Sequence, residues 1–132
     1  MPLLVREDRP RVKNLSILEP VCIFRVDVYS GVVARIVSIL RTRLREGVMA
    51  EYLPVAIEMM ELARTIPGFV EAKSFAAEDG ERVLIVTFAD RASHNVWRDH
   101  PRHREVQLLA PNFYVEGSVQ VTEETRSTKV TR

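Results

Sequence analysis

Very little cysteine is present in this sequence, which limits its covalent and metal chemistry. Cys22 is the only cysteine among 132 residues, so an intramolecular disulfide is excluded, and no histidine or second cysteine lies near it at metal-ligand spacing. We expect it to be a small buried apolar side chain. No metal site is expected at His94, His100 and His103 either, because they lack inward-facing carboxylate or cysteine companions and lie across a proline break.

Charge of one sign and long apolar runs are also lacking. The 19 basic residues are interleaved with 18 acidic ones, for a net charge of +1, so no broad field would attract nucleic acid or anionic lipid. No stretch is long and apolar enough to cross a bilayer, and the charged residues 6–9 interrupt the apolar run that a signal peptide needs. Together these features predict a cytoplasmic protein that binds neither nucleic acid nor membrane.

The residues that are present suffice for one folded domain. A hydrophobic share of 46% with 28% charged residues is ordinary for a globular chain of this length. Composition divides the chain into an N-terminal extension over residues 1–30, a domain over 31–123 and a polar tail over 124–132. Within the extension, Leu15–Ser30 shows the two-residue alternation of a half-buried strand, so we expect an extra strand there.

The first half of the domain predicts a strand, a helix and a hairpin. Val32–Leu44 is rich in β-branched residues and apolar on both faces, which is typical of a central strand. Met49–Thr65 carries apolar residues at three- and four-residue steps, and its proline, tolerated only in a first turn, predicts a helix start near Tyr52. Phe69–Ala77 and Arg82–Phe88 flank an Asp-Gly pair that predicts a hairpin turn.

The second half of the domain predicts helical segments and a last strand. Asp90–Asp99 reads as a helix with an aspartate N-cap. Pro101–Leu109 then reads as a kinked continuation or a new short helix, and Pro111 is expected to end it. Phe113–Val121 alternates apolar and polar residues, which predicts the final strand.

The order of these elements predicts the fold class. Strand, helix, two strands, helix and strand form the ferredoxin-like βαββαβ arrangement, an α+β fold with a four-stranded antiparallel sheet and its helices on one face. Apolar side chains point both ways along Val32–Leu40 and Val83–Phe88, so the other face of the sheet also needs cover. We expect two copies of the chain to pack their sheets together into a dimeric α+β barrel, because isologous pairing commonly hides such a surface.

Several short motifs between Val32 and Glu123 carry a family pattern. They are Glu51-Tyr52 to Met59, Leu62-Ala63 leading into Pro67-Gly68-Phe69, Asp79-Gly80, Trp97 to Arg104 with His100-Pro101 and His103, and Phe113-Tyr114. Together they resemble the antibiotic biosynthesis monooxygenase family. The resemblance implies a homodimer with a pocket between each sheet and its helices. In some members such a pocket oxidises polycyclic phenols to quinones with dioxygen and without metal, flavin or haem, so no cofactor is expected.

Two residues of the predicted second helix are candidates for catalysis. Successive helical residues turn by about 100°, which puts Ala92, Val96 and Trp97 on one inward face. His100 falls on the same face. Its imidazole could act as a base towards a phenolic substrate, because histidine titrates near neutrality, and the indole of Trp97 could be a flat wall for a polycyclic ring. Both could instead be ordinary core residues, with the imidazole satisfied by a backbone carbonyl.

Four further residues are candidates for binding a substrate, namely Tyr52, Tyr114, Met59 and Asn95. Each tyrosine has a hydroxyl that needs a partner when it is buried, although aromatic residues at these positions could equally be core. The helical wheel argues against Asn95 sharing a face with Trp97. We expect His94 and His103 to be solvated or to make contacts at helix ends.

Three functions remain open on this reading. The first is a cofactor-independent monooxygenase that oxidises an aromatic or polyketide-like phenol or quinol with molecular oxygen. The second is a non-catalytic dimeric module that binds a small molecule, because a fold alone does not imply a reaction. A haem-degrading oxygenase is the least favoured, since members with that role have an asparagine on the first strand and an axial histidine about three turns after the tryptophan. Here Val32–Leu44 has no asparagine, and Gln107 stands ten residues after Trp97.

Overall fold

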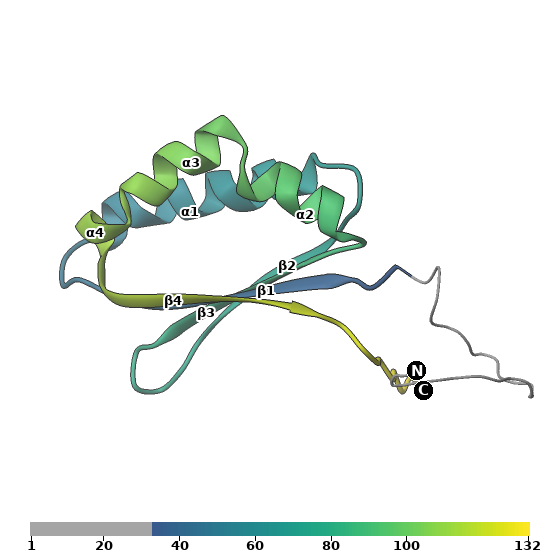
Figure 1. The fold of residues 1–132 in the computed structure, drawn as a ribbon. Coiled ribbons are helices and arrows are strands. Elements are labelled where there is room, and N and C mark those ends of the chain that lie inside the picture. Colours follow the sequence, from purple (N-terminus) through teal and green to yellow (C-terminus); the bar gives the residue numbers. More distant parts are fainter. Residues whose placement is uncertain (1–32) are drawn as a thin grey trace, which may run out of the picture. The chain divides into compact units, whose positions relative to one another are not determined.

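The computed structural model describes residues 33–132, and Ala34–Arg132 form one compact unit (Figure 1). The strand predicted over Leu15–Ser30 and the environment predicted for Cys22 lie outside the described residues. Within 33–132, no helix is long and apolar enough to cross a membrane. Residues 124–132 form neither helix nor strand.

Four antiparallel strands form one sheet in the order β2-β3-β1-β4. The strands are β1 (Ile36–Leu44), β2 (Phe69–Ala76), β3 (Arg82–Phe88) and β4 (Tyr114–Glu123), and the helices are α1 (Met49–Arg64), α2 (Arg91–Arg98), α3 (Pro101–Leu108) and α4 (Ala110–Phe113). Figure 1 shows the helices together on one face of the sheet. The predicted α+β fold of the ferredoxin-like type is confirmed.

Alternation along the central strand gives the sheet two different faces. Ile36, Ser38 and Thr42 of β1 are buried beneath the helices, because every second side chain of a strand points to the same face. The core on this side consists of Ala63 and Ile66 from the end of α1, Val86 and Phe88 from β3, and Trp97 from α2. Close packing of these side chains fixes the distance between the sheet and its helices at this end.

Helix α1 begins earlier than its proline suggested. The helix starts at Met49, and Pro54 lies inside it as the sixth residue, so the predicted start near Tyr52 is wrong. Pro54 lacks the N–H that would bond to the carbonyl of Ala50, but both residues are exposed, and water can bond to that carbonyl instead. The predicted apolar face is confirmed, since Met59 and Ala63 are buried.

Proline also failed to end the helical region near residue 111. Helix α3 does begin at Pro101 as a new helix, but Ala110–Phe113 then forms the further short helix α4. Pro111 occupies its first turn, where a missing N–H removes no helical hydrogen bond. The last strand therefore begins at Tyr114, and Phe113 is a buried helical residue.

Two local signals placed their turns correctly. Asp90 caps α2, and its side chain accepts a hydrogen bond from the backbone N–H of Ser93 at 2.8 Å. Gly80 turns the β2–β3 hairpin with φ +91°. A third glycine matters for the helix layer, because Gly68 has φ +100° and its Cα lies against the side chain of Ser93. The chain can therefore pass from α1 to β2 directly beneath the start of α2 only with glycine at position 68.

The face of the sheet away from the helices is partly apolar. In the β1–β3 ladder, Val37 pairs with Thr87, Ile39 with Ile85 and Arg41 with Val83, and directly paired residues share a face. Phe75 of β2, opposite Val83, belongs to the same face and is 48% exposed. Apolar side chains thus point both ways from the central strands, as the sequence predicted. We call this surface the open face of the sheet.

Candidate active site

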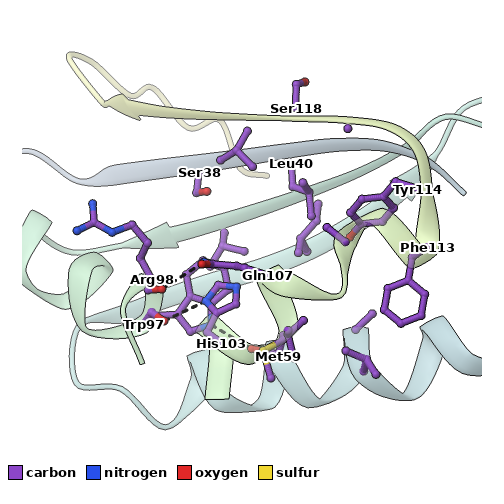
Figure 2. A pocket seen from close by; sticks show the side chains of 18 of the residues that line it. Ser38, Leu40, Met59, Trp97, Arg98, His103, Gln107, Phe113, Tyr114 and Ser118 are labelled. Atoms are coloured by element: carbon purple, nitrogen blue, oxygen red, sulfur yellow. Dashed lines mark hydrogen bonds between the residues drawn. The ribbon is translucent and has the colours of Figure 1, made fainter. Parts of the chain in front are cut away.

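A cavity of about 490 Å³ lies between the helix layer and the sheet. Ser38, Leu40, Leu84 and Val86 form its floor on β1 and β3, and side chains of all four helices and of β4 complete it. Figure 2 shows this arrangement, with the sheet on one side and the helices on the other. Its size falls within the range of about 300 to 1,000 Å³ that is usual for small-molecule sites, and its lining is largely apolar.

Trp97 forms a rigid wall of the cavity. Its indole is buried against Phe88, with ring centroids 5.6 Å apart, and its N–H donates a hydrogen bond to the backbone carbonyl of Met59 at 3.2 Å. Trp97 and Met59, two of the candidate site residues, both line the cavity. Because the indole N–H is already used to tie α2 to α1, Trp97 offers a bound molecule an apolar contact rather than a hydrogen bond.

His103 of α3 lies against this wall. Its ring centroid is 4.3 Å from that of Trp97, and its Nδ1 lies 3.0 Å from the Trp97 carbonyl oxygen, drawn as a dashed line in Figure 2. A carbonyl oxygen can only accept, so Nδ1 carries the hydrogen, and Nε2 has the free lone pair of the neutral ring. Burial lowers the pKa of His103. His103 is thus half-buried, and it makes the contact at a helix end that the sequence led us to expect, here with the last turn of α2.

His100, the predicted base, lies outside the cavity. It is the N-cap of α3, and its Nδ1 accepts a hydrogen bond from the backbone N–H of Arg102 at 3.1 Å. The residues that line the cavity do not include it. The helical wheel assumed one continuous helix through position 100, but α2 ends at Arg98 and the backbone at His100 is extended, with ψ 136°. The turn before Pro101 breaks the helical phase on which the prediction rested.

The residues that α2 turns inward also differ from those that helical periodicity predicted. Val96 is 55% exposed, Ala92 is exposed, and His94 is only 2% exposed and lines the cavity beside Trp97. The predicted inward positions of Val96 and Ala92, and the solvated state of His94, are wrong. Residues three apart share a helix face, so the signal for His94 was its spacing from Trp97. The same spacing on α3 relates His103 to Val106, which also lines the cavity.

Asn95 is not part of the cavity wall. Its Oδ1 and the Nδ1 of His94 are buried with no hydrogen-bond partner among the described residues. Burial lowers the pKa of His94, and the nearby Arg98 and Arg91 add to this effect. His94 is therefore held as a neutral imidazole.

Two tyrosines occupy the other end of the cavity. Tyr52 of α1 and Tyr114 of β4 both line it, with ring centroids 6.0 Å apart in an edge-to-face arrangement. Figure 2 shows Tyr114, beside Phe113, well separated from Trp97 and His103. Burial, together with Tyr52, raises the pKa of Tyr114. Its phenol therefore stays protonated at neutral pH and can donate a hydrogen bond.

The charges at the cavity rim are paired with one another or with neighbours. Arg98 makes two hydrogen bonds to the carboxylate of Asp99, at 2.8 and 2.9 Å. Glu116 accepts a hydrogen bond from Arg43 at 3.2 Å. Gln107 adds a neutral amide that donates to the carbonyl of Arg98 at 3.3 Å. Within the described part of the chain, no group of three or more His, Cys, Asp or Glu could hold a metal ion.

Solved structures of other proteins share this fold. A variant of SnoaB, a cofactor-independent oxygenase from Streptomyces nogalater, is 14% identical with a TM-score of 0.63, and the match covers 71% of this chain and 96% of that one. Rv0793 from Mycobacterium tuberculosis is 17% identical with a TM-score of 0.62, and the match covers 74% of this chain and 100% of that one. Protein SO0527 from Shewanella oneidensis is 13% identical with a TM-score of 0.62, and the match covers 69% of this chain and 91% of that one. No curated protein matches the chain by sequence.

The family itself follows from the sequence match. The family model described as antibiotic biosynthesis monooxygenase matches residues 35–108, which is more than half of the chain. The matched segment runs from β1 through the end of α3, so it contains Trp97, His103 and the cavity floor. The chain belongs to the antibiotic biosynthesis monooxygenase family.

Proposed function

We propose that the chain is a cofactor-independent monooxygenase that oxidises a flat aromatic phenol or related polyketide-like enol with dioxygen. The observation that carries the proposal is the cavity of about 490 Å³ whose wall is the fixed indole of Trp97. A buried aromatic surface in an apolar cavity favours a flat ring by stacking, at an interplanar distance that leaves no room for water between them. The shared fold of SnoaB, a cofactor-independent oxygenase, supports the same chemistry.

The reaction makes modest demands on a protein. The phenol loses its O–H hydrogen and the hydrogen of the ring carbon para to it, one oxygen atom of dioxygen becomes a new carbonyl oxygen at that carbon, and the other leaves as water with the two hydrogens. The anion of the substrate supplies the electrons, so the site needs a base, a dry cavity and hydrogen-bond donors for the oxyanion. Tyr114, which stays protonated, and its neighbour Tyr52 are proposed as donors, and Met59 as an apolar contact.

The cavity can be tested with two alanines of the same helix. Ala56 lines the cavity, whereas Ala50 is exposed. Oxygen uptake with a panel of anthrones and naphthols, corrected for autoxidation without protein, should show turnover by the wild type. Ala56→Phe should reduce kcat/KM by filling the cavity, and Ala50→Phe should not. No uptake above background with any member of the panel would contradict the proposal.

The same panel separates the main alternative, a module that binds a small molecule without changing it. The pairing of the rim charges supports such a binding module, because a cavity with few free reactive groups can serve binding alone. Binding of an anthrone, measured by calorimetry, without oxygen uptake would support the module. A haem-degrading role has no comparable support, because Gln107 rather than a histidine lines the cavity ten residues after Trp97.

We also propose that the chain forms a homodimer through the open face of the sheet. Ile39 and Ile85 lie side by side on that face, and an apolar sheet surface of this kind is commonly hidden by a second copy. Sedimentation velocity should give a dimer of the 15.1 kDa chain at micromolar concentration. Ile85→Lys should produce a monomer, whereas Ile57→Lys on the exposed side of α1 should not. A wild-type monomer at this concentration would refute the dimer.

A further inference from the structure

We propose that His103 is the general base of the cavity and that its substrate enters as an uncharged phenol. This inference rests on the proposed oxygenase function and extends it to the substrate's charge and to the residue that removes its proton. Three features support it, namely the tautomer of His103, its position against the Trp97 wall, and the pairing of the charged groups around the cavity.

The first feature is the fixed tautomer. The Nδ1–H of His103 is held by the Trp97 carbonyl at 3.0 Å, which leaves the lone pair on Nε2 as the only basic position of the ring. Nε2 makes no hydrogen bond with any described residue, and it is not among the side-chain atoms buried without a partner. It is therefore accessible, and His103 lines the cavity. A base with its acceptor atom free and its other nitrogen anchored needs no rearrangement to take a proton.

The second feature is the position of the base relative to the aromatic wall. The imidazole and the indole lie with centroids 4.3 Å apart and planes at 40°. The indole is only 6% exposed, so a phenol that touches the part of Trp97 lining the cavity would also lie beside the imidazole, with its hydroxyl within reach of Nε2. Figure 2 shows the His103 ring between the wall and the open part of the cavity. The geometry brings recognition of the ring and removal of its proton to one place.

The third feature is the electrostatic environment. Among the described lining residues, the only guanidinium is that of Arg98, paired with Asp99, and the only carboxylate is that of Glu116, paired with Arg43. An anionic substrate would find no free cation to compensate the loss of its hydration. A neutral phenol crosses the apolar rim at lower cost and must then be ionised inside.

The groups that face His103 are few. Only His94 and His100 bear directly on its charge, whereas Arg98, Tyr52, Tyr114 and Glu116 are the other titratable groups of the cavity lining. None of them is a free carboxylate that could hold a proton in competition with His103. Burial keeps the pKa of His103 below its ordinary value, so the ring is neutral at pH 7 and the lone pair on Nε2 is free to accept a proton.

The proton-transfer step balances within the cavity. The substrate O–H bond breaks and its proton bonds to Nε2, giving an imidazolium whose Nδ1–H still bonds to the Trp97 carbonyl and whose new Nε2–H bonds to the phenolate oxygen. The carbonyl dipole stabilises the positive ring, and the imidazolium stabilises the oxyanion. The anion then holds the electron pair that dioxygen accepts, and the proton on Nε2 is available to the water that leaves.

The decisive experiment compares His103→Gln with His100→Gln. Glutamine at position 103 can still donate to the Trp97 carbonyl but has no basic atom, whereas His100 lies outside the cavity. With a phenol whose pKa is near 10, His103→Gln should lower kcat by about 10²- to 10⁴-fold with little change in KM, and should lose the fall in rate that the wild type shows towards acid pH. With a phenol already ionised at the assay pH, both proteins should be slow, because the cavity offers the anion no free cation, but the variant should be no slower than the wild type. Equal losses with both phenols would overturn the assignment.

A binding measurement keeps the inference testable apart from the oxygen chemistry. A chromogenic phenol with a pKa near 7 reports its own ionisation by absorbance. Under anaerobic conditions more of it should be bound as the anion in wild type and His100→Gln than in His103→Gln. Equal anion fractions, or no binding at all, would overturn the role of His103. Failure of oxygen uptake alongside a clear difference in the bound anion would instead contradict only the oxygenase proposal.

Discussion

Gly68 offers a direct test of how the helix layer is held on the sheet. Its φ of +100° lies in the left-handed region, and a Cβ built there would stand 2.0 Å from the Oγ of Ser93 and 2.7 Å from its Cβ. The hydroxyl could rotate away, but the Ser93 Cβ is fixed to the first turn of α2. Gly68→Ala must therefore displace α2, the helix that carries Trp97.

The loss of unfolding free energy caused by Gly68→Ala has two parts, backbone strain and overpacking, which a matched control at Gly80 can separate. Gly80 has a similar φ of +91°, and a Cβ there meets nothing within 4 Å. Gly80→Ala should therefore cost only the left-handed backbone strain of about 1 to 2 kcal/mol. Gly68→Ala adds an overpacking cost of about 1 to 3 kcal/mol, so its total should be roughly 2 to 5 kcal/mol. Adding Ser93→Ala to Gly68→Ala should recover part of the difference, because it removes the nearer contact.

Trp97 is the only tryptophan in the chain and is buried, so its fluorescence reports unfolding in urea. The three variants and the wild type should be compared at one protein concentration, since association would shift the apparent stability. If Gly68→Ala proves no less stable than Gly80→Ala, the close packing of the α1–β2 turn under α2 is wrong.

Three further predictions concern the helices that form the cavity. Asp90→Ala should lower the unfolding free energy by about 1 kcal/mol, because it removes the cap on the N–H of Ser93, and an unchanged urea midpoint would contradict this. Trp97→Phe should cost about 2 kcal/mol, from the lost hydrogen bond to Met59 and the lost buried ring area, as measured by circular dichroism. His94 is buried with a lowered pKa, so its contribution to stability is complete above about pH 6.5 and is lost as the pH falls towards its folded value. His94→Gln should therefore be less stable than the wild type at pH 8, and the gap should narrow on acidification; a constant gap would show that His94 does not titrate in this range.

Local signals in the sequence were sufficient for most of the fold. The Asp-Gly hairpin, the Asp90 cap and the apolar face of α1 depend on interactions between residues a few positions apart, and each lies where it was predicted. The order of the elements then left few topologies open, because short connections and antiparallel pairing restrict the arrangements of four strands.

Proline marked the helix boundaries less well. Pro54 and Pro111 were each read as fixing an end of a helix, whereas one lies inside α1 and the other in the first turn of α4. A proline removes one hydrogen bond, and the neighbouring residues decide whether water or a new helix compensates for it. That depends on exposure, which the local sequence does not state.

The candidate site shows the same division between local and tertiary information. Sequence alone determined that Trp97 faces the core and that the chain has the family's fold, because both follow from periodicity and motif spacing. Among the three histidines it favoured His100, whereas the break between α2 and α3 makes His100 a helix cap and brings His103 onto the indole. Only the tertiary structure decided which imidazole nitrogen is free, because that depends on a hydrogen bond to the Trp97 carbonyl, made possible when two helices pack over one sheet.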